Sequence, residues 1–485
     1  MQHNDSSTGT TLLRGLVVPW RRYQLWRWQR QEVPRFLRRE EQYPRFVRRC
    51  ATTMDAIKWL RLLDWRVLPK DERHSCFGRQ PVPLAAYVGA FLVKLDHQLP
   101  TVARLRRFLV AHPALVWALG FPLPAGTAGA GFDVEGAVPS ARHLNRVLRE
   151  LPNHHLQALL DAQVRQVQGF LPDEVIGETI ALDTKHILAW VKENNHKQFI
   201  EEGRYDKHRQ PKGDSDCKLG CKRRGNQRPV TPASEAQPAS TLPSKAGEFY
   251  WGYASGAVVT RVAASHEFVL AELTQTFEKS EVSYFFPLLE QTERRLGRRP
   301  HFGALDAAFD AFYVYDYFHD PDHDGFAAVP FCNKGSATRR DFDPDGLPLC
   351  EAGLAMPAKL TYTDRTACLI PHRRTKHACP LLYPEPTGAS CPLRHKKWAK
   401  GGCGTTLADT PGARIRHQLD RHSETYLRIY RQRSAAERIF SQALALGIER
   451  PKLRNQAAIA NLNTLIYLLI NVRTIARLQP SLSGC

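Results

Sequence analysis

The chain has 485 residues, of which 43% are hydrophobic; this is enough for two or three domains and excludes a chain that is disordered throughout. Its 68 Lys and Arg residues outnumber 48 Asp and Glu residues, which gives a formal net charge of +20 at pH 7. Such an excess attracts polyanions and favours fast, salt-sensitive association with nucleic acid. A ribosomal or membrane-surface protein could carry the same charge, so the motifs must separate these classes.

No segment predicts a membrane span or a secretory signal. The most apolar stretch, 459–470, is interrupted by Asn461 and Asn463 and is too short to cross a bilayer. The N-terminus lacks a basic start followed by an apolar core. Eleven cysteines without a Cys-x-x-Cys pair favour free thiols in a reducing compartment. We therefore expect a cytoplasmic protein that is not bound to a membrane.

The first 170 residues predict an extension followed by a helical domain. Residues 1–66 are crowded with Arg and aromatic side chains, which can track a phosphate backbone while the rings stack; a poorly ordered extension is the alternative. Within 67–170 the apolar residues recur with helical period, and Ser140 is a candidate N-cap for a helix over 141–151. We expect an all-helical domain that binds DNA or mediates assembly.

The pattern then changes to that of an α/β domain, formed by residues 171–335 and 413–478. Short apolar runs predict strands at 175–183, 249–254, 257–263, 302–305 and 326–331. A final apolar stretch, 457–478, predicts a helix that packs on the sheet.

Two insertions interrupt this domain. Residues 194–247 are polar, basic and rich in Pro, Ser and Gly, which predicts an exposed insertion. Residues 336–412 lack helical periodicity and predict a β or irregular insertion. Their cysteines and histidines could bind a structural Zn²⁺, but the wide spacing lacks the close ligand pairs of zinc modules and favours thiols. These residues are Cys350, Cys368, Cys379, Cys391, Cys403, His372, His377 and His395.

Two aspartates come directly after apolar runs that predict buried strands: Asp183 follows 179–182, and Asp306 follows 302–305. An ionised carboxylate in such a place is costly unless it is paired or bound to a metal. Grouped carboxylates attract hard cations such as Mg²⁺, and two such ions can activate a water and stabilise the leaving oxygen of a phosphodiester. Asp310 is a rival for the second position, but Asp306 is preferred because it lies at the strand edge.

A helical stretch, 430–437, supplies a third carboxylate. At 100° per residue Glu437 lies about 20° from Tyr430 and Arg433 about 60° away, so the three side chains share a face. This combination suits a metal ligand with neighbours that contact phosphate oxygens. Taken alone, the stretch is more typical of a surface helix with an Arg-Glu pair. Asp183 and Asp306 are what favour a metal site.

These motifs resemble those of bacterial insertion-sequence DDE transposases, in which the third acidic residue sits in a Tyr-two-Arg-three-Glu-six-Lys signature. Tyr430, Arg433 and Glu437 match the spacing. The position of the signature's lysine is occupied by Leu444, which cannot make the expected contact with a phosphate or with flanking DNA. Arg450 or Lys452 could make this contact instead. Segments 99–105, 181–184, 250–253 and 305–310 also resemble the family, and the resemblance covers roughly residues 80 to 478.

The resemblance implies a ribonuclease H-like catalytic fold that uses Mg²⁺ or Mn²⁺, held by Asp183, Asp306 and Glu437. It implies double-stranded DNA as the partner: element ends, which are cut, and target DNA, which they join. Tyr430 and Arg433 would position phosphates. Lys185 and Arg438 could add phosphate contacts.

Three readings follow from the resemblance. The first is an active transposase, nucleoid-associated and at least a homodimer, because joining two ends needs two sites. The second is a DNA-binding protein derived from such an element and catalytically inactive. The third is a structure-specific nuclease on the same fold, which would cut DNA without strand transfer.

Overall fold

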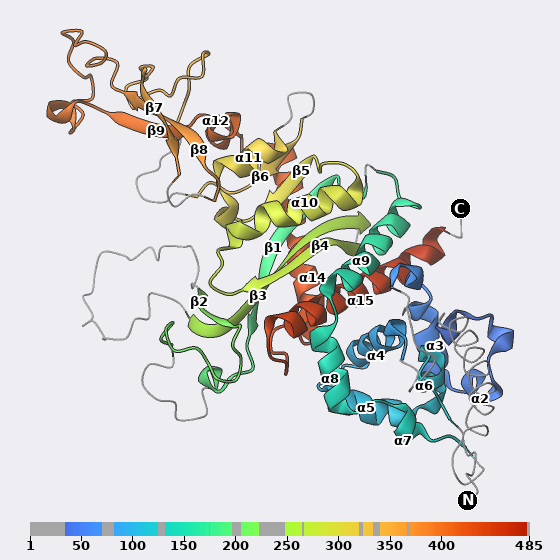
Figure 1. Cartoon of the computed structure of the whole chain (residues 1–485). Helices are drawn as coiled ribbons and strands as arrows, with labels where there is room; N and C mark the ends of the chain where they lie inside the picture. The colour runs from blue at the N-terminus through green and yellow to red at the C-terminus, as the bar shows by residue number, and fades with distance from the viewer. Residues whose placement is uncertain are drawn as a thin grey trace, which may run out of the picture.

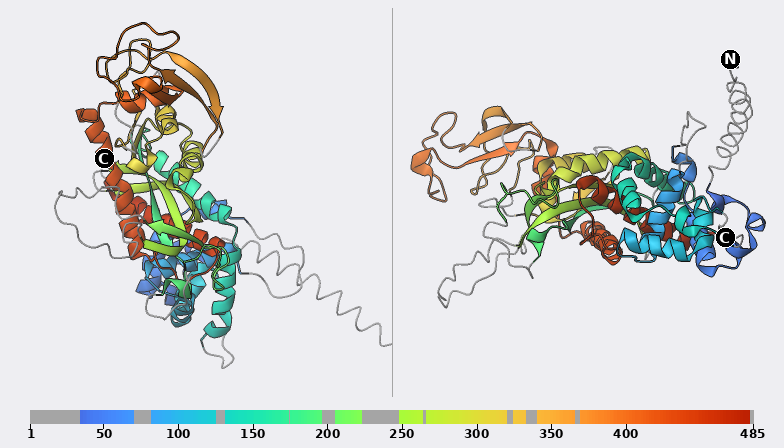
Figure 2. Two further views of the ribbon diagram at one scale, coloured as in Figure 1. Left: turned by 90° about the vertical axis from the view of Figure 1, so that its left-hand side faces the viewer. Right: turned by 60° about the horizontal axis from the view of Figure 1, so that its bottom comes forward.

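The computed structural model describes residues 34–69, 82–124, 131–173, 175–195, 205–222, 248–263, 266–319, 324–332, 340–365 and 369–482. Within them a helical unit, a central sheet with its covering helices and a small β lobe follow one another along the molecule (Figure 1). The turned views show the same order, with the lobe and the helical unit at opposite ends (Figure 2).

The helical unit packs around α4 (Leu84–Asp96), in which ten of thirteen residues are buried. Ser140 accepts a hydrogen bond from the His143 amide at 3.2 Å, which confirms the predicted N-cap. Part of the expected extension also belongs to this core, because Phe36 and Trp65 are buried in it. The Arg- and aromatic-rich motifs before residue 34 lie outside the described residues. The other helices of the unit are α2 (Arg45–Arg48), α3 (Ala51–Leu60), α5 (Val102–Ala111), α6 (Pro113–Leu119), α7 (Val134–Ala137), α8 (Ala141–Glu150) and α9 (Asn153–Gln168).

The central sheet is mixed, so the predicted α/β class is correct. Its strands are β1 (Thr179–Leu188), β2 (Lys218–Lys222), β3 (Glu248–Ala263), β4 (His266–Thr276), β5 (Phe302–Leu305) and β6 (Phe326–Ala328). The order is β2-β3-β1-β5-β6, and β4 pairs with β3 beside β2. β1 is antiparallel to β3 and parallel to β5, and β5 is parallel to β6.

The structure differs from the predicted strands at three points. β3 is one strand across the predicted break, where Gly256 lies so close to Tyr284 that a Cβ would meet the ring at 2.5 Å. β4 was not predicted as a strand, and it extends the sheet beyond β3. β2 lies inside the segment 194–247, which was expected to be an exposed insertion; instead, the part around β2 returns to the sheet, and Cys217 is fully buried there.

Helices cover both faces of the sheet. α14 (Ser434–Ala445) and α15 (Gln456–Leu482) cover one face, and α10 (Phe285–Leu296) and α11 (Phe312–Phe318) cover the other. Side chains of β1 alternate between them: Ala181 and Ile187 face the α14 and α15 side, while Ile180 and Leu182 face the α10 side.

α15 joins the sheet to the helical unit, and it passes from one to the other in both views of Figure 2. Among the described helices it alone is long and apolar enough to span a membrane, but 89% of that window is buried inside the protein. Asparagine side chains of α15 make hydrogen bonds with backbone groups of neighbouring elements. Asn471 exchanges two hydrogen bonds with the Val269 backbone of β4, at 2.8 and 2.9 Å. Asn461 donates to the carbonyls of Leu148 and Leu151 at the end of α8.

The insertion 336–412 contains a three-stranded antiparallel sheet of β7 (Ala358–Asp364), β8 (His372–Ala378) and β9 (Gly404–Ala408). In its described residues Met356 is the only large buried aliphatic or aromatic side chain. The two ends of the lobe are held together by Arg416 of α12 (Pro411–Gln418), which donates to Asp310 and to the Cys332 carbonyl.

Glu272 of β4 makes the stability of the fold depend on pH. Burial raises its pKa to about 7, although hydrogen bonds from Thr464 and Gln157 favour the ionised form. The folded state therefore binds the proton more tightly than the unfolded state, and stability is lost as pH rises from about 4.5 to 7.

Glu272→Gln should remove this loss. We expect the variant to gain up to about 3 kcal/mol over the wild type in free energy of unfolding between pH 5 and pH 8, because one pKa unit corresponds to about 1.4 kcal/mol. Urea unfolding at both pH values measures this, with exposed Glu290→Gln as the control. An equal gain in the control, or no pH-dependent gain for Glu272→Gln, would contradict the assignment.

Candidate active site

The pairing of β1 with β5 brings Asp183 and Asp306 together. Leu182 pairs with Leu305 in parallel register, so the next residue of each chain segment is an aspartate. Side-chain alternation directs both carboxylates to the face that α14 covers, because Leu182 and Leu305 face the opposite cluster. The two sequence-predicted aspartates are therefore neighbours across the edge of this strand pair.

Burial raises the pKa of Asp183 to about 7. The Thr184 amide, which donates to Asp183 Oδ1 at 2.7 Å, opposes this shift, and the charges of Asp306 and Glu281 add to it. Arg433 lowers the pKa slightly. Asp183 is thus a half-buried carboxylate with too little positive charge around it to offset the effect of burial on its ionised form.

Asp306 ends β5 and caps the short helix that follows. Its side chain accepts a hydrogen bond from the Ala308 amide at 2.8 Å and remains half-buried. No ion pair neutralises it among the described residues. The second carboxylate is therefore held in place by the backbone, with lone pairs left over for another ligand.

Glu281 is a third carboxylate close to Asp183 and Asp306, and it was not predicted from the sequence. It begins the 3₁₀ helix Glu281–Tyr284 after β4, and Thr184 Oγ1 approaches its Oε1 at 3.5 Å. Burial raises its pKa, and the charge of Asp306 adds to the shift. Because β4 was not predicted, nothing in the sequence indicated that Glu281 lies at the end of a strand.

The stretch 430–437 is not one continuous helix, so that prediction is wrong. α13 (Glu424–Tyr430) ends at Tyr430, a 3₁₀ turn (Arg431–Arg433) follows, and α14 begins at Ser434. The tighter turn invalidates angles computed at 100° per residue. Tyr430 stacks on Tyr426 with ring centroids 5.8 Å apart, whereas Glu437 is 53% exposed.

Arg433 interacts with both Glu437 and Asp183. Its Nη2 is 2.6 Å from Glu437 Oε1, and its charge also acts on Asp183. The Arg-Glu pair that the sequence suggested as the simpler reading is therefore present. Among the described residues no group of three or more His, Cys, Asp or Glu side chains is placed to hold a metal ion. The structure brings Asp183 and Asp306 together and leaves Glu437 bound to Arg433.

The other predicted DNA contacts have partners within the protein. Lys185 of β1 lies 3.2 Å from Glu449, and Arg438 of α14 lies 2.5 Å from the buried Glu267. Leu444, at the signature's lysine position, is 47% exposed. Lys185 and Arg438 could contact DNA only with atoms that these pairs leave free.

Asp310, the rival for the second position, is fully occupied. Its side chain is 0% exposed and pairs with Arg416 at 2.5 Å. The Cys332 amide and the Tyr315 hydroxyl also donate to it, at 2.7 and 2.8 Å. This set of partners makes Asp310 a structural residue that anchors the lobe.

Burial raises the pKa of Cys403 to about 12, and the nearby sulfurs of Cys379 and Cys350 add to the shift. Among the described residues of the lobe no group of three or more His, Cys, Asp or Glu side chains is placed to hold a metal ion. Cys368 lies outside the described residues.

No protein-family model matches the chain, and no curated protein matches it. The site is therefore interpreted from its own geometry and chemistry.

Asp306 and Asp310 should differ sharply in their effect on stability. Asp310→Ala leaves the largely buried Arg416 without its carboxylate partner and should lower the free energy of unfolding by about 3–5 kcal/mol. Asp306→Asn keeps the capping oxygen and should change it by less than about 1 kcal/mol. Thermal and urea unfolding of both variants measure the difference; similar losses would contradict the structural role of Asp310.

Proposed function

We propose that this chain is a DDE-type DNA transposase with a ribonuclease H-like catalytic domain. One observation carries the proposal: two half-buried aspartates, Asp183 within β1 and Asp306 directly after β5, lie side by side where the parallel pairing of these strands ends. A mixed sheet covered by helices on both faces supports the fold. The net charge of +20 supports DNA as the substrate.

The residues present fit a divalent cation. Asp183 is half-buried with a raised pKa, and among the described residues the Thr184 amide is its one hydrogen-bond donor, so a nearby cation would favour its ionised form. Asp183 and Asp306 would hold Mg²⁺ or Mn²⁺ through carboxylate oxygens, with Glu437 as the third ligand. When bound, the metal would supply an activated water and neutralise the leaving oxygen.

Glu437 can serve as a ligand only if its pair with Arg433 opens. A phosphate group is the natural competitor, because guanidinium binds phosphate and carboxylate oxygens with the same geometry. DNA that reaches Arg433 would therefore release Glu437 beside Asp183. Tyr430, half-exposed and stacked on Tyr426, would border the same strand.

Glu281 would orient the site from the opposite side. Its charge acts on both aspartates, and Thr184 connects its carboxylate to the strand that carries Asp183. We assign it a positioning role, since its carboxylate approaches from β4 rather than from the strand pair.

The resemblance supplies the reaction sequence. A water oxygen bonds to the scissile phosphorus at the element end, and the 3′ oxygen leaves as a free 3′-OH. That 3′-OH then bonds to a phosphorus of target DNA, whose own 3′ oxygen leaves. Joining two ends requires at least two copies of the chain.

An inactive DNA-binding protein is the second candidate, because Glu437 is paired with Arg433 and no three-ligand group occurs in the described residues. It predicts tight DNA binding with no strand cutting in Mg²⁺ or Mn²⁺. A nuclease on the same fold predicts cutting without joining, so one assay that follows both products separates all three.

Asp183→Asn, Asp306→Asn and Glu437→Gln should each lower cleavage of DNA carrying the element ends by a factor of about 10²–10³, because losing one preorganised charge costs about 3–4 kcal/mol. Glu281→Gln should lower it by about 10–100-fold, as for groups that orient metal ligands. Gel assays in Mn²⁺ measure both, with Glu290→Gln as the control. Wild-type rates in all three carboxylate variants would rule out the proposal.

Metal binding should also be visible without DNA. At 100 times its dissociation constant Mn²⁺ should stabilise the wild type by about 2.7 kcal/mol, because it binds only the folded state. Asp183→Asn and Asp306→Asn should lose the corresponding rise in melting temperature, while Glu290→Gln keeps it. An undiminished rise in both aspartate variants would place the ion elsewhere.

A further inference from the structure

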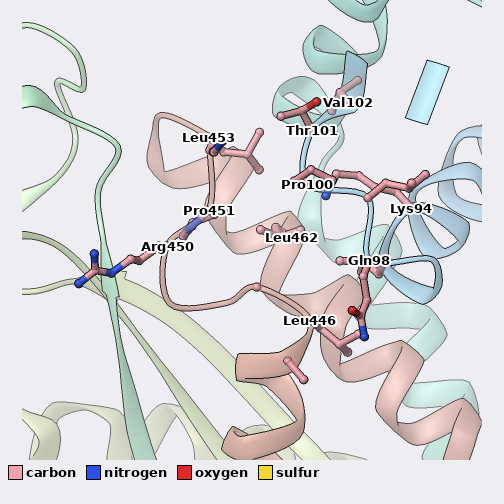
Figure 3. A pocket seen from close by; sticks show the side chains of 15 residues that line it. Lys94, Gln98, Pro100, Thr101, Val102, Leu446, Arg450, Pro451, Leu453 and Leu462 are labelled. Atoms are coloured by element: carbon pink, nitrogen blue, oxygen red, sulfur yellow. The ribbon is translucent and has the colours of Figure 1, made fainter. Parts of the chain in front are cut away.

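A cavity of about 260 Å³ lies where the helical unit meets the catalytic part of the chain. The turn between α4 and α5 forms one wall, and the connection between α14 and α15 forms the other (Figure 3). Its volume is below the roughly 300–1,000 Å³ of typical small-molecule sites. The size suits a small group rather than a whole cofactor.

The charged side chains that line the cavity are all positive. Lys94, Arg450 and Lys452 line it, and no Asp or Glu is among its described lining residues. Leu446, Leu453 and Leu462 complete the walls with apolar side chains. Because apolar walls lower the local dielectric, the field of these cations is stronger there than on an open surface. Such a cavity attracts an anion.

Lys94 is the central cation. It lies in the last turn of α4, where its carbonyl accepts a hydrogen bond from the Leu99 amide at 2.9 Å. Its half-buried side chain forms no ion pair or hydrogen bond with the described residues. Burial lowers its pKa to about 8. An ammonium group without a partner is costly, and a bound anion would offset that cost.

The start of α5 adds to the attraction. Thr101, its N-cap, and Val102, its first residue, both line the cavity. The positive end of a ten-residue helix therefore lies beside Lys94. This arrangement favours an anion with several acceptor oxygens.

The connection between α14 and α15 also links the cavity to β1, the strand that carries Asp183. Glu449 pairs with Lys185 of β1, and its carbonyl accepts a hydrogen bond from the Leu188 amide at 2.8 Å. Next to it, the Arg450 guanidinium points away from Lys94 and toward the strands (Figure 3). A polyanion lying along the connection would thus meet Arg450 between the sheet and the cavity.

We propose that this cavity binds a backbone phosphate of double-stranded DNA, with Lys94 as its ion-pair partner and Lys452 as the second cation. The choice of DNA rests on the proposed function; the preference for a phosphate rests on the cavity itself. The site would provide, from the helical unit, the phosphate contact that Leu444 cannot make.

The first experiment measures protection of Lys94. The full chain is labelled at pH 8 with an amine-reactive ester, and mass spectrometry quantifies each lysine. Inorganic phosphate should lower labelling of Lys94 by about fivefold or more against chloride at equal ionic strength, because a close anion raises a lysine pKa by one unit or more. Exposed Lys58, already paired with Asp55, should change by less than about twofold.

The second experiment identifies the source of the phosphate. A 30-base-pair duplex of arbitrary sequence should protect Lys94 in the wild type and in Arg107→Gln, which removes an exposed cation of α5 outside the cavity. Lys94→Met should weaken duplex binding and reduce the slope of log affinity against log salt by about one. Lys452→Gln should reduce it in the same way. Because Lys94 has no ion-pair or hydrogen-bond partner among the described residues, Lys94→Met should fold normally.

The outcomes are distinct. Lys94 labelling that responds to neither phosphate nor duplex overturns the proposal, even if the wild type cleaves element ends. Protection by phosphate but not by duplex overturns DNA as the occupant. Protection by the duplex also overturns DNA as the occupant if Lys94→Met leaves the slope of log affinity against log salt unchanged. The duplex would then cover the cavity without placing a phosphate in it. Protection together with a reduced slope supports the cavity, even if no cleavage occurs and the proposed activity fails.

Discussion

The parallel pairing of β1 with β5 is the constraint on which the site depends. A parallel pair needs a crossover, and the long connection from β1 to β5 supplies β3, β4 and α10, which complete and cover the sheet. The register then fixes which residues meet where the pairing of β1 with β5 ends. A shift of one residue would turn Asp183 to the α10 face and separate it from Asp306.

α15 is buried on nearly all sides, so the polar backbone groups around it must find hydrogen-bond partners on the helix. Asn471 completes the hydrogen bonding of β4, and Asn461 caps the end of α8. These amides interrupt the apolar pattern that otherwise suggests a membrane segment. Their positions make the contact between the sheet and the helical unit specific rather than merely hydrophobic.

The sequence predicted what local pattern determines and missed what tertiary contacts determine. β5 and the cap at Ser140 follow from short-range signals and were correct. The 3₁₀ turn after Tyr430 was missed, because neither Gly nor Pro marks it. Of the site, the neighbouring positions of Asp183 and Asp306 could be anticipated from two apolar runs that each precede an aspartate, although β1 continues to Leu188 and Asp183 lies within it rather than at its end. Glu281 could not, because its place depends on β4, whose polar and apolar residues follow no simple alternation.

The lobe of β7, β8 and β9 begins and ends at one anchor, formed by Asp310, Arg416 and the Cys332 backbone. It contributes almost no apolar surface to the clusters that hold the central sheet and its helices together. The lobe therefore behaves as an exchangeable module. Insertions in the lobe, substitutions on its surface or its replacement would leave the register of β1 and β5 unchanged, as long as the anchor at its base is kept.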